Sequence, residues 1–149
     1  MTREDFWKHI EQIDRTALGL GKENVAIRPL EVSLSTLTPA DLESFEEHLS
    51  QCLFTLDGRA YADAAGESAG SDDAFLYARC FVVAQGREHY EATLKDPSLM
   101  PQTLAGWCES LLYVHHRAWA ALTGKNESEW AFEAAVSFES GSNIELWPC

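Results

Sequence analysis

The chain has 149 residues, 46% of them hydrophobic and 11% aromatic, which fits one globular domain and argues against a disordered chain. Asp and Glu number 24 against 11 Lys and Arg, so the formal net charge is -13. A chain of this charge repels the phosphates of nucleic acids and of anionic lipids. We therefore expect it to bind neither nucleic acid nor a membrane.

The start of the chain is polar, because residues 1–15 contain no apolar run of the kind found in signal peptides. No later segment approaches the roughly 20 consecutive apolar residues that span a bilayer. The four cysteines are far apart and form no C-x-x-C pair; they are Cys52, Cys80, Cys108 and Cys149. These features predict a cytoplasmic protein with free thiols and leave its oligomeric state open.

The N-terminal part of the chain predicts two helices. Thr2 suits an N-cap with Asp5 in the first turn, and apolar residues recur at helical spacing as far as Gly19, where the first helix should end. Those apolar residues are Phe6, Ile10, Ile13 and Ala17. Because proline is favoured in the first turn of a helix, a short second helix is predicted to begin at Pro29 and to run through Leu37.

The strongest helix-start signal spans residues 38–41, with a capping threonine, a proline at the first helical position and an acid in the first turn. The helix that follows should bury Leu42, Phe45, Leu49 and Leu53. Its other face should present Glu43, Glu46 and Glu47 to solvent. Because no Lys or Arg lies between Pro29 and Gly58, we predict a negative patch there and take these three glutamates as candidates for binding a basic partner.

The rest of the chain predicts further helices at residues 59–65, 71–85, 87–94, 102–122 and 129–136. Ser71 suits the N-cap of the second of these. The tail after residue 137 has no clear pattern, and no alternating run indicates a sheet. We predict an all-α fold, a compact single-domain bundle of about six to seven helices over residues 1–149. The long helix and the tail make up residues 101–149.

The histidines carry little sign of metal binding. His115 and His116 are adjacent, so on a helix their side chains diverge by about 100° and cannot chelate one ion as an i, i+4 pair does. The sequence contains no nucleophile motif, phosphate-binding loop or dinucleotide-binding fingerprint. We therefore predict no metal site and no cofactor.

One dense polar segment has two interpretations. In the first, Asp72 and Asp73 complement the dipole of a helix, and Arg79 balances a partly buried acid, since it lies among apolar residues. In the second, Asp72, Asp73 and Arg79 gather with Tyr61 to bind a small ligand in a pocket between helices. The sequence favours the first interpretation.

Several short blocks also occur together in a known family. They are Phe6-Trp7, residues 56–61 (LDGRAY), residues 70–75 (GSDDAF), Arg79, residues 85–87 (QGR), Tyr90 and Asp96-Pro97. Over residues 4 to about 100, these blocks resemble a bacterial family of unknown function, domain-of-unknown-function family 4240. The resemblance implies a small all-helical domain and supplies no activity.

Two hypotheses for function follow from these patterns. The first is a non-catalytic module that binds a basic protein partner, as an immunity protein or antagonist of a basic toxin does. The acidity of the chain and the lack of catalytic motifs favour this hypothesis over an enzyme. The second is a small-molecule-binding protein or enzyme whose polar site surrounds Asp72, Asp73 and Arg79.

Overall fold

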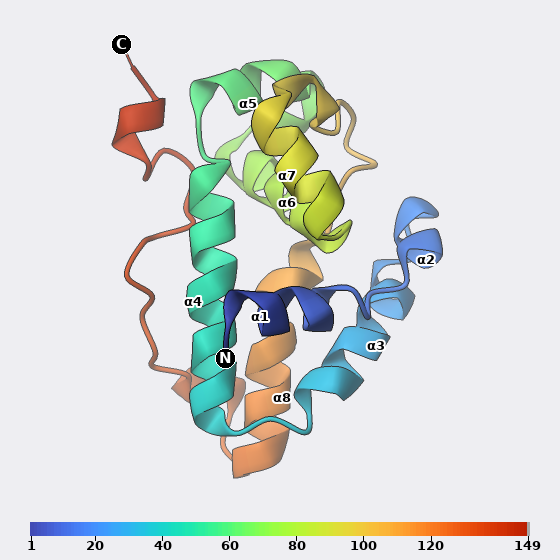
Figure 1. Ribbon diagram of the computed structural model, residues 1–149, viewed down its shortest axis with the longest axis vertical. Coiled ribbons are helices and arrows are strands. Elements are labelled where there is room, and N and C mark those ends of the chain that lie inside the picture. Colours follow the sequence, from blue (N-terminus) through green and yellow to red (C-terminus); the bar gives the residue numbers. More distant parts are fainter. Residues whose placement is uncertain (149) are drawn as a thin grey trace.

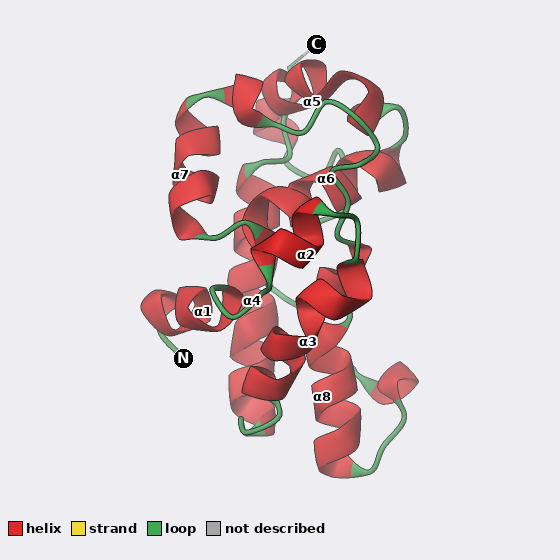
Figure 2. Cartoon of the chain, turned by 90° about the vertical axis from the view of Figure 1, so that its right-hand side faces the viewer, coloured by secondary structure: helices red, strands yellow, loops and turns green. Residues whose placement is uncertain are grey.

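A computed structural model describes residues 1–148, within which the chain forms eight α-helices, five short 3-10 helices and no strand (Figure 2). The α-helices are α1 (Arg3–Ile10), α2 (Arg15–Gly19), α3 (Glu23–Leu34), α4 (Pro39–Thr55), α5 (Arg59–Ala65), α6 (Asp72–Ala84), α7 (Arg87–Lys95) and α8 (Val114–Thr123). The 3-10 helices are η1 (Gly66–Ala69), η2 (Pro97–Leu99), η3 (Glu109–Leu112), η4 (Glu127–Glu129) and η5 (Ile144–Leu146). The predicted all-α fold is confirmed.

Helix α4 is the longest element and runs along the long axis of the molecule (Figure 1). Helix α1 crosses it, α8 lies beside it, and α3 packs on α8. Helices α5, α6 and α7 gather at one end of α4. None of the helices in residues 1–148 combines the length and the apolar character needed to cross a bilayer.

The core lies between these helices and is built largely from leucine and phenylalanine. Side chains with no exposed surface come from α1, α3, α4 and the 3-10 helix before α8; they include Phe6, Ile10, Leu30, Leu34, Leu42, Phe45, Leu49, Leu53 and Leu111. The four positions predicted to be buried on α4 are all among the buried residues. Burying such side chains contributes about 1.5–3 kcal/mol each relative to leaving them in water.

Three predicted helix starts are confirmed by their hydrogen bonds. Thr2 and Asp5 form a reciprocal capping box at the start of α1. Thr38 accepts a hydrogen bond from a backbone N–H of the first turn of α4, and Ser71 does the same for α6. These polar side chains satisfy backbone donors that a helix leaves unpaired, so local sequence alone decides where each helix begins.

The two helices predicted before residue 38 have different bounds. The first ends at Ile10, and a new helix begins after Asp14, whose side chain caps it. Pro29 lies inside α3 rather than at its start. A proline there removes the hydrogen bond to the carbonyl of Val25. Val25 and Pro29 are exposed, so water can replace that bond.

The long helix predicted at 102–122 is wrong in its first half. Only Val114–Thr123 is α-helical, and residues 101–108 form an irregular segment. The side chain of Trp107 packs against Tyr77 of α6 with the two rings tilted, their centroids 4.5 Å apart, and the N–H of Cys108 donates to the Tyr77 carbonyl at 3.4 Å. Trp107, one of the apolar residues whose spacing predicted a helix, is therefore placed by a contact with α6 and not by a helical turn.

The short helix predicted at 129–136 is also wrong. After α8 the chain turns back and runs along α4 in a largely extended path, which we call the strap (residues 126–147; Figure 1). Three of its backbone N–H groups, those of Ala135, Gly141 and Asn143, donate to carboxylates outside the strap rather than within a helix. The backbone N–H of Ala135, for example, donates to the Glu47 carboxylate of α4 at 2.9 Å.

The end of the strap is held by Asp57, a fully buried carboxylate just after α4. It accepts hydrogen bonds from the backbone N–H groups of Gly141 and Asn143, at 3.0 and 2.9 Å, and from the indole N–H of Trp147, at 2.9 Å. One side chain therefore fixes three separate points of the strap.

A second buried group, Arg79 of α6, also holds the strap. Its guanidinium donates to the Leu53 carbonyl and to the Ser140 hydroxyl, both at 2.9 Å. The Ser140 hydroxyl donates in turn to the Asp72 carbonyl at 2.7 Å. The strap therefore joins the end of α4 to the start of α6.

We expect Asp57→Ala to release the strap from the helices, because three donors lose their common acceptor. Protease should then cut within residues 126–147 faster than in the wild-type protein, and the free energy of unfolding should fall by about 1–3 kcal/mol. Asp63→Ala provides the control, since Asp63 is an exposed acid on the neighbouring helix α5. Equal cleavage rates for the two variants and the wild type would show that Asp57 does not hold the strap.

Candidate functional site

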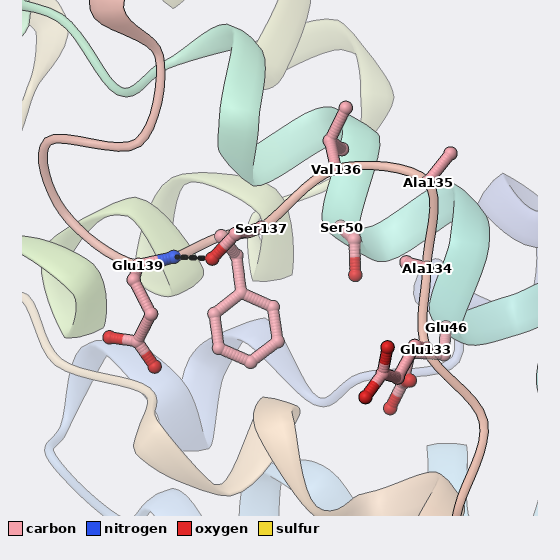
Figure 3. A pocket seen from close by; sticks show the side chains of 9 residues that line it. Glu46, Ser50, Glu133, Ala134, Ala135, Val136, Ser137 and Glu139 are labelled. Carbon is pink, nitrogen blue, oxygen red and sulfur yellow. Dashed lines mark hydrogen bonds between the residues drawn. The ribbon is translucent and has the colours of Figure 1, made fainter.

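A cleft of about 320 Å³ separates α4 from the strap (Figure 3). It is lined by Glu46 and Ser50 of α4 and by residues 133–139 of the strap. Figure 3 shows Ser50 pointing into the cleft, with the carboxylates of Glu46 and Glu133 together at one end. Glu139 lies toward the other end. The lining contains three glutamates and no Lys or Arg.

At the end of the cleft, Glu46 accepts hydrogen bonds from three ring N–H groups. Nε2 of His115 lies 2.8 Å from Glu46 Oε1, and Nε2 of His116 lies 2.9 Å from the same oxygen. The indole N–H of Trp130, on the strap, donates to Oε2 at 3.2 Å. One carboxylate thus joins α4, α8 and the strap.

The three rings also pack on one another. The centroids of His115 and His116 are 4.3 Å apart, and Trp130 lies 5.3 Å from the first and 4.9 Å from the second. His115 and Glu46 are buried, with 1% and 8% of their surface exposed, whereas His116 is 21% exposed on its side chain. Of Glu46, His115 and His116, the last is therefore the one that solvent reaches most easily.

The surroundings fix the protonation of the cluster. Burial acts to raise the pKa of Glu46, but hydrogen bonds from His115, His116 and Trp130 outweigh it and lower that pKa from 4.5 to about 2. Burial lowers the pKa of His115 from 6.5 to about 4. At neutral pH, Glu46 is therefore charged and His115 is neutral. Because an ionised carboxylate only accepts hydrogen bonds, Nε2 of His115 carries the proton.

His115 and His116 reach the same oxygen of Glu46, although their adjacency on a helix led us to expect that they would point apart. Adjacent residues on a helix do diverge, but His115 and His116 lie in the first turn of α8, and the acceptor on α4 lies between their rings. Both side chains are long enough to reach that carboxylate. The potential ligand atoms of Glu46, His115 and His116 lie within 4.8 Å of one another.

The negative patch predicted on α4 is only partly exposed. Glu43 is exposed, whereas Glu46 is buried under the strap, and Glu47 is half-buried and accepts the Ala135 N–H. The expected exposure of Glu46 is therefore wrong. The helical pattern placed this residue on the outer face of α4 correctly, but a segment 80 to 90 residues later in the chain covers that face.

The predicted ligand-binding group of Tyr61, Asp72, Asp73 and Arg79 is not gathered into one site. Arg79 is fully buried, as its apolar neighbours predict, and its guanidinium stacks over Phe75 at 4.7 Å. Asp72 and Asp73 are exposed, and within residues 1–148 neither carboxylate pairs with Arg79. Tyr61 donates its hydroxyl to the Leu94 carbonyl at 2.9 Å. The acid that favours the charged form of Arg79 most strongly is Asp57.

Comparison with known proteins supplies a family and no activity. The model of the family described as "Protein of unknown function (DUF4240)" matches residues 1–121. No curated protein and no solved structure matches the chain. The matched part contains Glu46, Asp57, Arg79 and both histidines of the cluster, and the strap follows it. Because the match extends over most of its length, the chain belongs to the DUF4240 family of proteins of unknown function.

Proposed function

We propose that this protein is a non-catalytic module that binds a basic protein partner, with the strap and the adjoining face of α4 as its docking surface. An antagonist that neutralises a basic toxin is one form of such a module. The observation that carries the proposal is the juxtaposition of two segments that contain no Lys or Arg. They are α4 (Pro39–Thr55) and the strap (residues 126–147).

The strap makes this surface acidic. It presents five exposed glutamates: Glu127, Glu129, Glu133, Glu139 and Glu145. Hydrogen bonds from Trp130 and Ala135 hold it against α4, where Glu43 adds another exposed acid. A surface of one sign attracts a partner of the opposite sign over about 8–10 Å at physiological ionic strength. Such charges mainly raise the association rate and select the partner.

The geometry supports binding better than catalysis. The Glu46 carboxylate already accepts three hydrogen bonds, so it is poorly placed to take a proton from a substrate. Ser50 lines the same cleft one helical turn away, and no base lies within hydrogen-bond distance of its hydroxyl in residues 1–148. A nucleophile needs such a base to be activated.

We expect a variant that neutralises strap charges to associate more slowly with its partner. Glu127→Gln, Glu133→Gln and Glu145→Gln together remove three charges whose side chains make no hydrogen bond or ion pair within residues 1–148. The partner would first be captured from native cells with the wild-type protein and identified by mass spectrometry. The rate at which the partner associates with the triple variant should be roughly tenfold lower than with the wild-type protein at low salt. At high salt the two rates should converge.

A matched control removes the same charge elsewhere. Asp63→Asn, Glu67→Gln and Glu88→Gln also neutralise three exposed acids, on α5, η1 and α7. This variant should bind at close to the wild-type rate. Equal slowing of both variants would show that net charge rather than the strap steers the partner. A partner that binds all three proteins equally well would place the interface elsewhere.

For the small-molecule alternative, the cleft between α4 and the strap is our first candidate site, because the exposed Asp72 and Asp73 carboxylates do not pair with the buried Arg79. A metabolite that purifies with the protein, with no protein partner recovered, would favour it.

We also propose that the protein works in the cytoplasm. Its cysteines Cys52, Cys80 and Cys108 are buried and free, as thiols in a reducing compartment are.

A further inference from the structure

We propose that Glu46, His115 and His116 form a binding site for one divalent transition-metal ion of the zinc class. The proposal does not depend on the docking of a basic partner, because none of the three ligands belongs to the strap. Two imidazole nitrogens and one carboxylate oxygen from α8 and α4 supply three ligands.

The distances between the ligand atoms fit an ion with a small adjustment. Both Nε2 atoms lie 2.8–2.9 Å from the same oxygen of Glu46, where they form hydrogen bonds. Bonds of about 2.0–2.1 Å in a tetrahedral arrangement place ligand atoms about 3.3 Å apart. The cluster therefore has to open by about half an ångström to admit an ion, and each histidine has to carry its proton on Nδ1 instead of Nε2. His116 borders solvent and can make that movement.

The chemistry of the ligands selects the kind of ion. Imidazole and carboxylate together suit zinc and its first-row neighbours, whereas calcium and magnesium prefer oxygen ligands alone. To bind through Nε2, His115 must move its proton to Nδ1, which is buried and has no hydrogen-bond partner within residues 1–148. An unpaired buried N–H costs free energy, so an ion with strong bonds to imidazole is favoured over weakly bound ions such as magnesium.

The surroundings of the cluster resemble those of a metal site in two respects. The indole N–H of Trp130 holds the second oxygen of Glu46, which fixes the orientation of the carboxylate. The cleft between α4 and the strap reaches the cluster at Glu46, which lines it.

Titration of the purified full-length protein with Zn²⁺ and Co²⁺ tests the site. We expect one Zn²⁺ per chain by calorimetry and a rise in the temperature of unfolding with Zn²⁺ concentration. Bound Co²⁺ should give the visible bands of a four- or five-coordinate ion with nitrogen and oxygen ligands. His116→Ala should abolish binding at this site, and since the side chain borders solvent the variant should fold. Glu46→Gln should weaken binding in the same way.

His89→Ala serves as the control, because His89 lies on α7 and is not part of the cluster; it should bind Zn²⁺ like the wild type. Three results would overturn the proposal. The wild-type protein could bind no Zn²⁺, His116→Ala could bind it as tightly as the wild type, or bound Co²⁺ could show the near-ultraviolet bands of thiolate ligands. Each would leave Glu46 and its histidines as a hydrogen-bonded network only.

Discussion

Replacing Arg79 by alanine is expected to lower the free energy of unfolding by about 3–5 kcal/mol. The guanidinium has no exposed surface and donates to the carbonyl of Leu53 and the hydroxyl of Ser140. Its removal leaves a cavity and leaves the buried carboxylate of Asp57 without the positive charge nearby. Both effects are costly inside a protein, where little water reaches the uncompensated charge.

Denaturant unfolding of Arg79→Ala, Arg79→Met and Arg28→Ala would separate these effects. Methionine fills most of the cavity without a charge, so it isolates the electrostatic part of the loss. Arg28 is exposed on α3, and its replacement should change stability by no more than about 0.5 kcal/mol. If Arg79→Ala proved as stable as Arg28→Ala, Arg79 would have no structural role, and its burial would require a functional explanation.

The metal-free protein is expected to lose up to about 3 kcal/mol of stability as the pH falls from 6.5 to 4, chiefly through His115. Its pKa is near 6.5 in the unfolded chain and about 4 in the folded protein. Between these values the unfolded chain binds a proton that the folded protein does not, so acid favours unfolding. Glu46, with a pKa of about 2 in the folded protein, adds a further loss below pH 4.5.

This effect can be measured by denaturant unfolding at a series of pH values in the presence of a chelator. His115→Phe keeps an aromatic ring beside Phe45 and Trp130 but cannot titrate. Its stability should therefore change much less between pH 6.5 and 4 than that of the wild type. The same pH dependence in both proteins would mean that His115 is not buried in its neutral form.

The sequence predicted those parts of the fold that depend on neighbouring residues. The caps at Thr2, Thr38 and Ser71 are local hydrogen bonds, and each marks a helix start in the structure. The bounds of other helices depend on tertiary contacts. Pro29 is tolerated inside α3 because the affected turn faces solvent. The segment before α8 is irregular because Trp107 packs on Tyr77.

The candidate site could be predicted only in part, because its members are distant in sequence. Glu46 lies 69 residues from His115 and 84 from Trp130. The helical pattern placed Glu46 on the outer face of α4, and nothing local to that helix indicates that the strap covers it. The one available signal was the strap's own composition: several glutamates and no Lys or Arg after Lys125. It indicates a charged surface and not its position.

Hydrogen exchange in the complex with the captured partner tests the proposed docking surface most directly. The proposal predicts that backbone amides in residues 126–147 exchange more slowly in the complex than in the free protein. Amides on the outer face of α3, where Val25 and Val32 are exposed, should be unchanged. Slower exchange confined to α3 or to the helices α5 to α7, with the strap unaffected, would contradict the proposal.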